Sequence, residues 1–285
     1  MTASAEEGNA VLVAVDGSAA STAAVGVASA WAVRRKVGLS IAHVVGSPLI
    51  GGAHGPDPLP SAVAAALAAH PGLDVRALGR TGPPDRVLAE LARDHSLLVL
   101  GSRGHGAIRD AALGSHAVVL AATAPCPVVV VRPGAHRLRP GGPVVAALAG
   151  GPRDAPVLEF AFAEAAQRGV PLVVVHSVAH SVDRLLPAGR LVLAALAPGA
   201  GPILADEVRS ELGPWCARHP QVRVQVEARH GRPAAAVLEA ARGAGLLVVG
   251  SRGRGVRAGL LLGSVSQGVL HHVHSPLAIV PADFA

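Results

Sequence analysis

Short apolar runs rich in valine, leucine and isoleucine alternate with longer alanine-rich stretches along the 285 residues of the chain. Apolar runs of this length are typical of strands buried on both sides, and the alanine-rich stretches are long enough for crossover helices. The pattern therefore predicts an α/β fold in which parallel sheets carry helices on both faces. The ten expected strands are 11–15, 39–45, 73–78, 97–101, 127–131, 143–148, 171–176, 222–227, 246–250 and 276–280.

The helices expected in the first half of the chain have recognisable ends. Ser18 is a candidate N-cap for the first of them, because a serine hydroxyl can accept a hydrogen bond from a free N–H of the first turn. Gly38 follows the end of the same helix, where glycine commonly terminates helical structure. The expected helices of this half are 19–36, 60–70, 83–94 and 115–123.

The second half of the chain repeats the first. The segment LVLGSRGHG at 98–106 returns as LVVGSRGRG at 247–255, an offset of 149 residues, whereas VLVAVDGS at 11–18 corresponds to VVAALAGG at 144–151, an offset of 133. The difference between the offsets means that the second copy carries sixteen extra residues, best placed in the Pro- and Gly-containing stretch 181–202.

A linker rich in Pro, Gly and Arg, residues 132–142, separates the two copies. We therefore expect one domain at residues 1–137 and a second at 138–285.

Composition narrows the classes of partner. The net charge of +6 comes from arginines scattered along the chain, with Lys36 as the only lysine. With three phenylalanines and no tyrosine, the chain lacks aromatic platforms for bases, so we expect no nucleic-acid binding. No apolar run reaches membrane-spanning length and the acidic start has no signal-like region, which predicts a cytoplasmic protein without membrane association. Cys126 and Cys216 have no disulfide or zinc spacing and are interpreted as inert thiols.

A glycine-rich loop follows the fourth strand of each copy. The first copy reads GSRG at 101–104, then nine residues, then Gly-Ser at 114–115; the second has GSRG at 250–253 and Gly-Ser at 263–264 with the same spacing. In an open parallel sheet, ligands bind beyond the carboxyl ends of the strands, where the strand order reverses. Glycines allow close approach of the backbone, and the helix that each serine opens presents free N–H groups to an anion. The loops are therefore candidate phosphate-binding sites.

The spacing GxxG, nine residues, G[ST], found twice after a buried strand, resembles the ATP-binding signature of the universal stress protein family. The segments VAVDGS, IAHVVG, GPPDRVL and APCPVVVV add to a resemblance that covers nearly the whole chain in tandem. It implies two Rossmann-like domains of the adenine nucleotide alpha hydrolase-like type, each with a five-stranded parallel sheet and helices on both faces. It also implies ATP as the ligand, and leaves open whether Mg²⁺ accompanies it.

The resemblance further implies which residues bind. In nucleotide-binding members, the aspartate ending strand one and a backbone group ending strand two approach adenine and ribose, while the glycine loop holds the phosphates. The corresponding positions in the first copy are Asp16, Val44, Gly101, Arg103, Gly104, Gly114 and Ser115. Those in the second are Ser177, Gly250, Arg252, Gly253, Gly263, Ser264, Val265 and Ser266.

Each copy departs from the family pattern at a different end of the ligand. The first has Ala117 where the family often has a second hydroxyl, which the second keeps as Ser266. The second has Ala149 in place of Asp16, and Ser177 in place of an apolar residue. A lost charge-assisted hydrogen bond costs about 1.5 to 3 kcal/mol, or roughly tenfold to a hundredfold in affinity. Our hypothesis is that at least one half holds ATP, with the first half favoured by its aspartate.

Several features keep a plainer interpretation beside the functional one. Asp16 could instead cap the following turn, and both roles are compatible. Arg103 and Arg252 could neutralise phosphate or be ordinary surface arginines. The run HHVH at 271–274 invites a metal interpretation, but a surface helix end is favoured, and no metal is expected.

No nucleophile elbow, Walker lysine pattern or pair of acids at catalytic spacing is present, so no catalytic residue is assigned. His43 and His176 end the second strand of each copy and are likewise given no catalytic role. Three functions stay open: a stress-response or regulatory nucleotide-binding protein, a nucleotide-free scaffold acting through protein association, and a slow ATPase. The protein partner cannot be named from the sequence.

Members of the resembling family commonly pair through their fifth strands. In a tandem chain, VVVVR at 128–132 and LAIVP at 277–281 could pair with each other. The expected result is an intramolecular domain pair, which could dimerise again.

Overall fold

The computed structural model describes residues 9–46, 56–102, 114–133, 141–178, 208–252 and 262–284. Within them, ten strands form one continuous sheet in the order β3-β2-β1-β4-β5-β10-β9-β6-β7-β8. The strands are β1 (Val11–Ala14), β2 (Leu39–Val45), β3 (Val75–Thr81), β4 (Leu97–Gly101), β5 (Val128–Val131), β6 (Val144–Leu148), β7 (Leu172–Val178), β8 (Val224–His230), β9 (Leu246–Gly250) and β10 (Leu277–Val280). All ten strands expected from the apolar runs are present, which confirms the α/β class.

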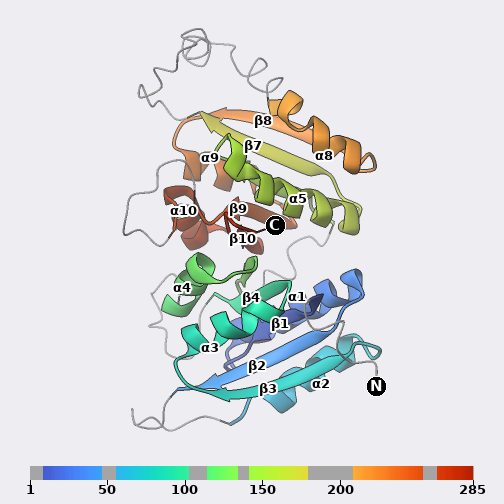
Figure 1. The fold of residues 1–285 in the computed structure, drawn as a ribbon, viewed down its shortest axis with the longest axis vertical. Coiled ribbons are helices and arrows are strands. Elements are labelled where there is room, and N and C mark those ends of the chain that lie inside the picture. Colours follow the sequence, from blue (N-terminus) through green and yellow to red (C-terminus); the bar gives the residue numbers. More distant parts are fainter. Residues whose placement is uncertain are drawn as a thin grey trace.

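Each half of the sheet is parallel, and the two halves meet antiparallel. Strands β1 to β5 occupy the lower part of Figure 1, and β7 to β10 are labelled in the upper part. At the junction, β10 pairs antiparallel with β5, with Leu277 opposite Val130 and Ile279 opposite Val128. The predicted pairing of the two fifth strands within one chain is confirmed.

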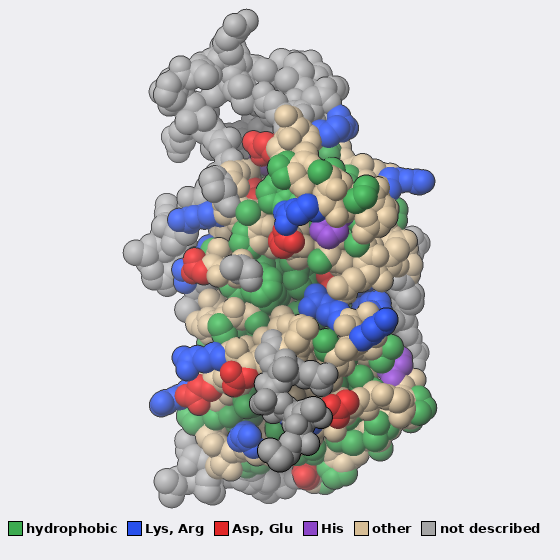
Figure 2. Space-filling model, turned by 45° about the vertical axis from the view of Figure 1, so that its right-hand side comes forward, with side chains coloured by type: hydrophobic (Ala, Val, Ile, Leu, Met, Phe, Trp, Pro, Cys, Tyr) green, Lys and Arg blue, Asp and Glu red, His purple; other side chains and the backbone are tan. Residues whose placement is uncertain are grey.

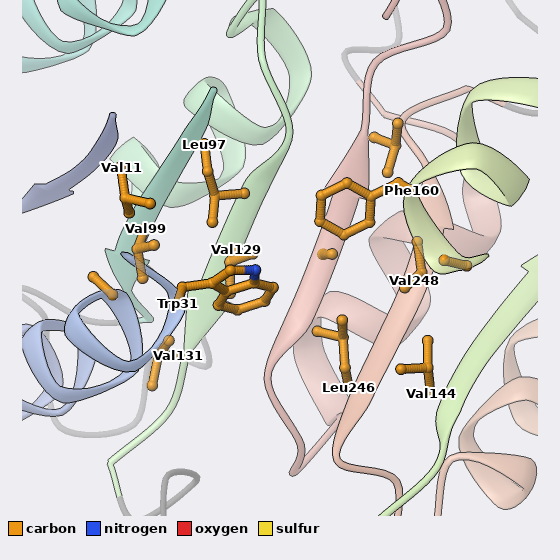
Figure 3. Close-up of a cluster of buried hydrophobic side chains, with 14 of the residues drawn as sticks. Val11, Trp31, Leu97, Val99, Val129, Val131, Val144, Phe160, Leu246 and Val248 are labelled. Carbon is orange, nitrogen blue, oxygen red and sulfur yellow. The ribbon is translucent and has the colours of Figure 1, made fainter. Parts of the chain in front are cut away.

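Alternating residues of the buried strands enter two apolar layers, one on each face of the sheet. In β9, for example, Leu246 and Val248 contribute to one layer, and Leu247 and Val249 to the other. Both layers run through both halves, and Figure 3 shows Trp31 and Phe160 in the first of them, near the junction. Helices α1 (Ala19–Arg35), α2 (Leu59–Ala69), α5 (Ala155–Arg168) and α8 (Gly213–Arg218) cover that layer. Helices α3 (Pro84–Leu91), α4 (Ser115–Thr123), α9 (Pro233–Ala240) and α10 (Ser264–His272) cover the other.

The two ends of α1 lie close to where the sequence predicts them. The Ser18 hydroxyl accepts a hydrogen bond from the N–H of Ser21, so its predicted role as N-cap is confirmed. The helix ends at Arg35, one residue earlier than predicted, with Lys36 as its C-cap, and Gly38 lies beyond that end as expected. Lys36 has φ 57° and ψ 44°, and is the only non-glycine residue of the described segments with a positive φ. The equivalent residue after α5 is Gly169, with φ 64°.

The largest differences from the predicted element boundaries are at the ends of β3, β8 and α3. Strands β3 and β8 end at Thr81 and His230, three residues later than predicted, because β2 and β7 pair with them along seven positions each. The added residues are Gly-Arg-Thr at 79–81 and Ala-Arg-His at 228–230, none of them large and apolar, as an outer strand of the sheet tolerates, so the apolar pattern stops too early. Helix α3 ends at Leu91 and continues as a 3₁₀ turn over Ala92–Asp94.

A buried polar cluster joins the two halves through α1 and α5. The Glu164 side chain is fully buried and accepts hydrogen bonds from Trp31 Nε1 at 2.6 Å, Arg35 Nη2 at 2.7 Å and Arg168 Nε at 3.0 Å. The Arg168 guanidinium also lies 4.6 Å from the centre of the Trp31 ring. Trp31 and Glu164 occupy equivalent positions of the two copies, as do Arg35 and Arg168. The cluster is therefore built from one pair of matching positions with different residues and one pair with the same residue.

Other predictions fall partly outside the described residues. The proposed insertion at 181–202 and the proposed domain boundary at 137–138 both lie there. No helix among the described residues is long and apolar enough to cross a membrane. On the face drawn in Figure 2, Lys and Arg side chains are scattered among acidic and hydrophobic ones, as the spread of arginines along the sequence predicts.

Candidate functional site

The strand order places one reversal point in each half. In the first half it lies between β1 and β4, because α1 leads outward from β1 to β2 and α4 leads from β4 to β5 on the other side. In the second half it lies between β6 and β9. Since the halves meet antiparallel, the carboxyl ends of their strands lie at opposite edges of the sheet. The candidate sites are therefore separate.

The two glycine loops are anchored by the same backbone hydrogen bonds. The N–H of Ser102 donates to Val131 O at 2.8 Å, and the N–H of Gly114 donates to Ser102 O at 2.9 Å. Ser251 and Gly263 make the matching bonds in the second half. The two residues that flank each loop are therefore hydrogen-bonded to each other, beside the carboxyl end of the fourth strand of its half.

A helix opens at the returning end of each loop. Gly114 precedes α4 and Gly263 precedes α10, both with extended backbone and neither with a side-chain cap among the described residues. The exposed residues Ser115 and Ser264 are the first in each helix. Free N–H groups at these positions suit a bound anion.

In the first half, the turn between β1 and α1 is built around Asp16. Its Oδ1 accepts the N–H of Ser18 at 3.0 Å, and its own N–H donates to the Ser21 hydroxyl at 3.4 Å. Gly17, at φ 84°, takes the left-handed conformation that the turn requires. The turn-capping role suggested for Asp16 is thus confirmed.

In the second half, a different acid supports the same turn. Asp154, equivalent to Ser21, accepts the N–H of Ala149 at 3.1 Å and that of Gly150 at 2.5 Å. The residue is only 8 % exposed, and burial raises the pKa of its carboxyl, although both N–H donors and nearby His176 act in the opposite direction. Asp154 therefore directs its charge at its own backbone.

Gly101 and Gly250, which end β4 and β9, differ in the space around them. A Cβ atom on Gly101 would lie 2.8 Å from the backbone of Ala20 and Ser21, because α1 packs directly on the end of β4. A Cβ atom on Gly250 would meet nothing closer than 3.4 Å. The glycine in the first half is thus required by helix packing, whatever it binds.

The hydroxyl groups near the loops also differ. Ser266 is buried and its Oγ donates to Gly250 O at 2.5 Å, so its proton is used within the protein. Ala117, at the equivalent position, offers no such bond. The buried Oγ of Ser102 has no hydrogen-bond partner among the described residues and lies directly after β4.

At the ends of the second strands, Val44 lies half-buried in β2 and Ser177 lies in β7, where it pairs with Arg229. His43 Nδ1 is hydrogen-bonded to Val15 O at 2.8 Å, which ties β2 to the end of β1. His176 Nδ1 is buried without a partner among the described residues.

Some predicted site residues cannot be placed. Arg103, Gly104 and Gly253 lie outside the described residues, whereas Arg252 is exposed and Val265 is half-buried in the first turn of α10. In the described segments no three His, Cys, Asp or Glu side chains are grouped to hold a metal ion; the run 271–274 spans the end of α10 and the loop after it.

Sequence reasoning missed two polar features of these edges. One is the Asp154 carboxylate, which comparison with Ser21 could have revealed. The other is His116, whose Nδ1 lies 2.6 Å from Asp85 Oδ1 and joins the first turn of α4 to that of α3. The second copy has Val265 and Ala234 at these positions, so the pair belongs to the first half alone.

The Cys126 thiol is inert, as the sequence predicts. Cys126 is buried, and burial raises the pKa of its thiol to about 12, which makes it unreactive at neutral pH.

Comparison with known proteins gives consistent matches. The model of the Universal stress protein family matches residues 9–132 and 142–281. A universal stress protein of Mycolicibacterium smegmatis is 33% identical over 290 residues, covering 95% of this chain and 96% of that protein. A crystal structure of a universal stress protein from Archaeoglobus fulgidus covers 97% of this chain and 99% of its own, with a TM-score of 0.67 and 18% identity, a likeness in fold. A further universal stress protein from Archaeoglobus fulgidus, solved in complex with dAMP, covers 49% of this chain with a TM-score of 0.35 and 26% identity.

Proposed function

The chain belongs to the universal stress protein family as a tandem member, and we propose that it binds an adenine nucleotide, ATP, at the carboxyl edge of its first half. In this role it acts as a stress-response or regulatory protein whose nucleotide occupancy is read by a partner.

The observation that carries the proposal is the difference between the two β–α turns. In the first half, a neutral hydroxyl, Ser21, accepts the N–H of Asp16, so the aspartate is held at the end of β1 and beside the reversal point. In the second half, Asp154 accepts two backbone N–H groups and Ala149 replaces the aspartate. At the end of the first strand, the first half has a carboxylate suited to ribose or adenine hydrogen bonds, and the second half has Ala149.

The phosphate end of the first half fits the same ligand. The α4 N-terminus begins at Ser115 with Gly114 as a cap that contributes no side chain, and the buried Ser102 hydroxyl beside it lacks a partner among the described residues. Three phosphates of a nucleotide would supply acceptors for both. The second half has an equally open α10, so it could contribute a weaker phosphate site that lacks the nucleoside contact.

Isothermal titration of the full chain with ATP tests the proposal, with dAMP as a second ligand. Asp16→Ala should weaken ATP binding by roughly tenfold to a hundredfold, the worth of one charge-assisted hydrogen bond. Ala149→Asp is the matched change in the other half and should leave the principal site unaltered.

Because Asp16 also supports its turn, Asp16→Asn provides the control for structure, since its amide oxygen can still accept the Ser18 N–H. Binding that survives Asp16→Ala unchanged would contradict the assignment to the first half. Absence of binding by the unaltered chain, together with no nucleotide in the purified protein by mass spectrometry, would favour the nucleotide-free scaffold.

A further inference from the structure

A cavity lies in the first half at the opposite edge of the sheet from its glycine loop. It has a volume of about 740 Å³ and lies where the C-terminal ends of α1 and α2 approach the start of β3. This volume is within the range of small-molecule sites. Its apolar lining includes Val33, Val37 and Leu73; Val33 is 42 % exposed and one of two exposed large hydrophobic residues in the described segments.

Opposite charges line the same cavity without neutralising each other. Lys36, His70 and Asp74 all contribute to the lining, and within the described residues none of the three side chains makes an ion pair or hydrogen bond. The Asp74 carboxylate is positioned beside Gly38, where a Cβ atom would lie 3.5 Å from Oδ2. Lys36 and Asp74 are both exposed at the cavity and make no ion pair with each other, and a cation and an anion in this arrangement match a ligand that carries both charges.

The duplication shows that the turn does not require these charges. In the second half, His219 and Val222 form the turn that His70 and Leu73 form in the first, with the same 3.0 Å backbone bond. At the two charged positions, however, Gly169 replaces Lys36 and Arg223 replaces Asp74. The same backbone is therefore built without the pair of opposite charges.

Lys36 also occupies a conformation that disfavours it. It adopts the left-handed region at the end of α1, where Gly169 serves in the second half. A side chain with a Cβ is strained there, and such outliers gather at functional positions. The chain's only lysine is thus kept where glycine would be easier to accommodate.

From this constellation we propose that the cavity binds a free α-amino acid with an apolar side chain. Lys36 pairs with the ligand carboxylate and Asp74 with its ammonium group, and Val33, Val37 and Leu73 contact the side chain. The carbonyl ends of α1 and α2 nearby favour the ammonium group. The site is independent of the nucleotide site, because it lies at the other edge of the sheet.

Saturation-transfer NMR with the full chain and millimolar leucine tests the proposal. Leucine should bind, whereas 4-methylpentanoate, which lacks the ammonium group, and 3-methylbutylamine, which lacks the carboxylate, should each bind at least tenfold more weakly. Lys36→Gly and Asp74→Arg introduce the residues of the second half and should each abolish leucine binding.

The first substitution relieves the left-handed strain, so its thermal midpoint should be equal to or above that of the unaltered chain, which excludes unfolding as the cause of lost binding. Leucine should also protect Lys36 from acetylation by an amine-reactive ester, measured by mass spectrometry of the peptide that contains the single lysine. Failure of leucine, valine and phenylalanine to bind at 10 mM, or equal binding by Lys36→Gly and the unaltered chain, would overturn the proposal.

Discussion

Exchanging Trp31 and Glu164 should separate the effect of their pairing from the effect of either residue alone. The two positions are equivalent in the duplicated helices α1 and α5, and Arg35 and Arg168 are equivalent beside them. Trp31→Glu alone would place a second carboxylate against the buried Glu164. Glu164→Trp alone would leave two arginines without the acid they share. The double exchange restores one indole, one carboxylate and both arginines across the same junction.

The structure sets the expected magnitudes. The Glu164 side chain is 0 % exposed, and the Arg35 and Arg168 side chains are 15 % and 10 % exposed, so solvent screens the ion pairs only weakly. Breaking a buried pair by removing one partner costs about 3 to 5 kcal/mol, so Glu164→Trp should lower the free energy of unfolding by that amount. Trp31→Glu removes a fully buried indole, and loss of a buried Trp side chain also costs about 3 to 5 kcal/mol. The double exchange should recover more than half of the loss. Recovery should be incomplete because Phe160, which faces Arg35, has Val27 as its equivalent.

Urea unfolding followed by far-ultraviolet circular dichroism measures these differences, provided that the slope with denaturant is the same for all four proteins. The reasoning is refuted if Glu164→Trp costs less than about 1 kcal/mol, the range of exposed ion pairs. It is equally refuted if the double exchange is as unstable as the sum of the single substitutions.

Three further substitutions test the candidate edges. Gly101→Ala should destabilise the chain by about 1 to 3 kcal/mol, because its Cβ would overlap the backbone of Ala20 and Ser21. Gly250→Ala, where the Cβ has more space, should cost less. Equal thermal midpoints for the two variants would contradict the packing argument. Burial raises the folded-state pKa of Asp154 above its ordinary 3.8, so the protonated form favours folding. The free energy of unfolding of the unaltered chain, relative to that of Asp154→Asn, should therefore be highest below about pH 4 and fall as pH rises through the folded-state pKa. If this stability difference instead rises with pH, the two backbone N–H donors to Asp154 outweigh its burial.

The sequence was sufficient for the strands, the duplication and the junction between the fifth strands, since each depends on apolar runs or on repeated landmarks. It was insufficient for the ends of the outer strands β3 and β8, because their last residues pair through backbone atoms that every residue has. An apolar pattern cannot report such pairing where side chains face solvent.

The hydrogen bonds of the buried acids Asp154 and Glu164 also could not be predicted from the sequence pattern. Nothing local indicates that Asp154 turns back to the N–H groups of Ala149 and Gly150, because that depends on the short 3₁₀ turn before α5. Likewise, the contact between Trp31 and Glu164 joins residues 133 positions apart. Hydrophobic periodicity does not indicate which polar atoms of two helices meet.

Because β5 and β10 pair within one chain, assembly of the ten-stranded sheet does not depend on protein concentration. Two separate domains would associate only above their dissociation constant, whereas halves of one chain meet at the high effective concentration that a short connection imposes. The paired form therefore persists at any level of expression. Because the two halves always associate, they do not have to be identical as the subunits of a homodimer are. One half can therefore have Asp16 or Lys36 where the other has Ala149 or Gly169.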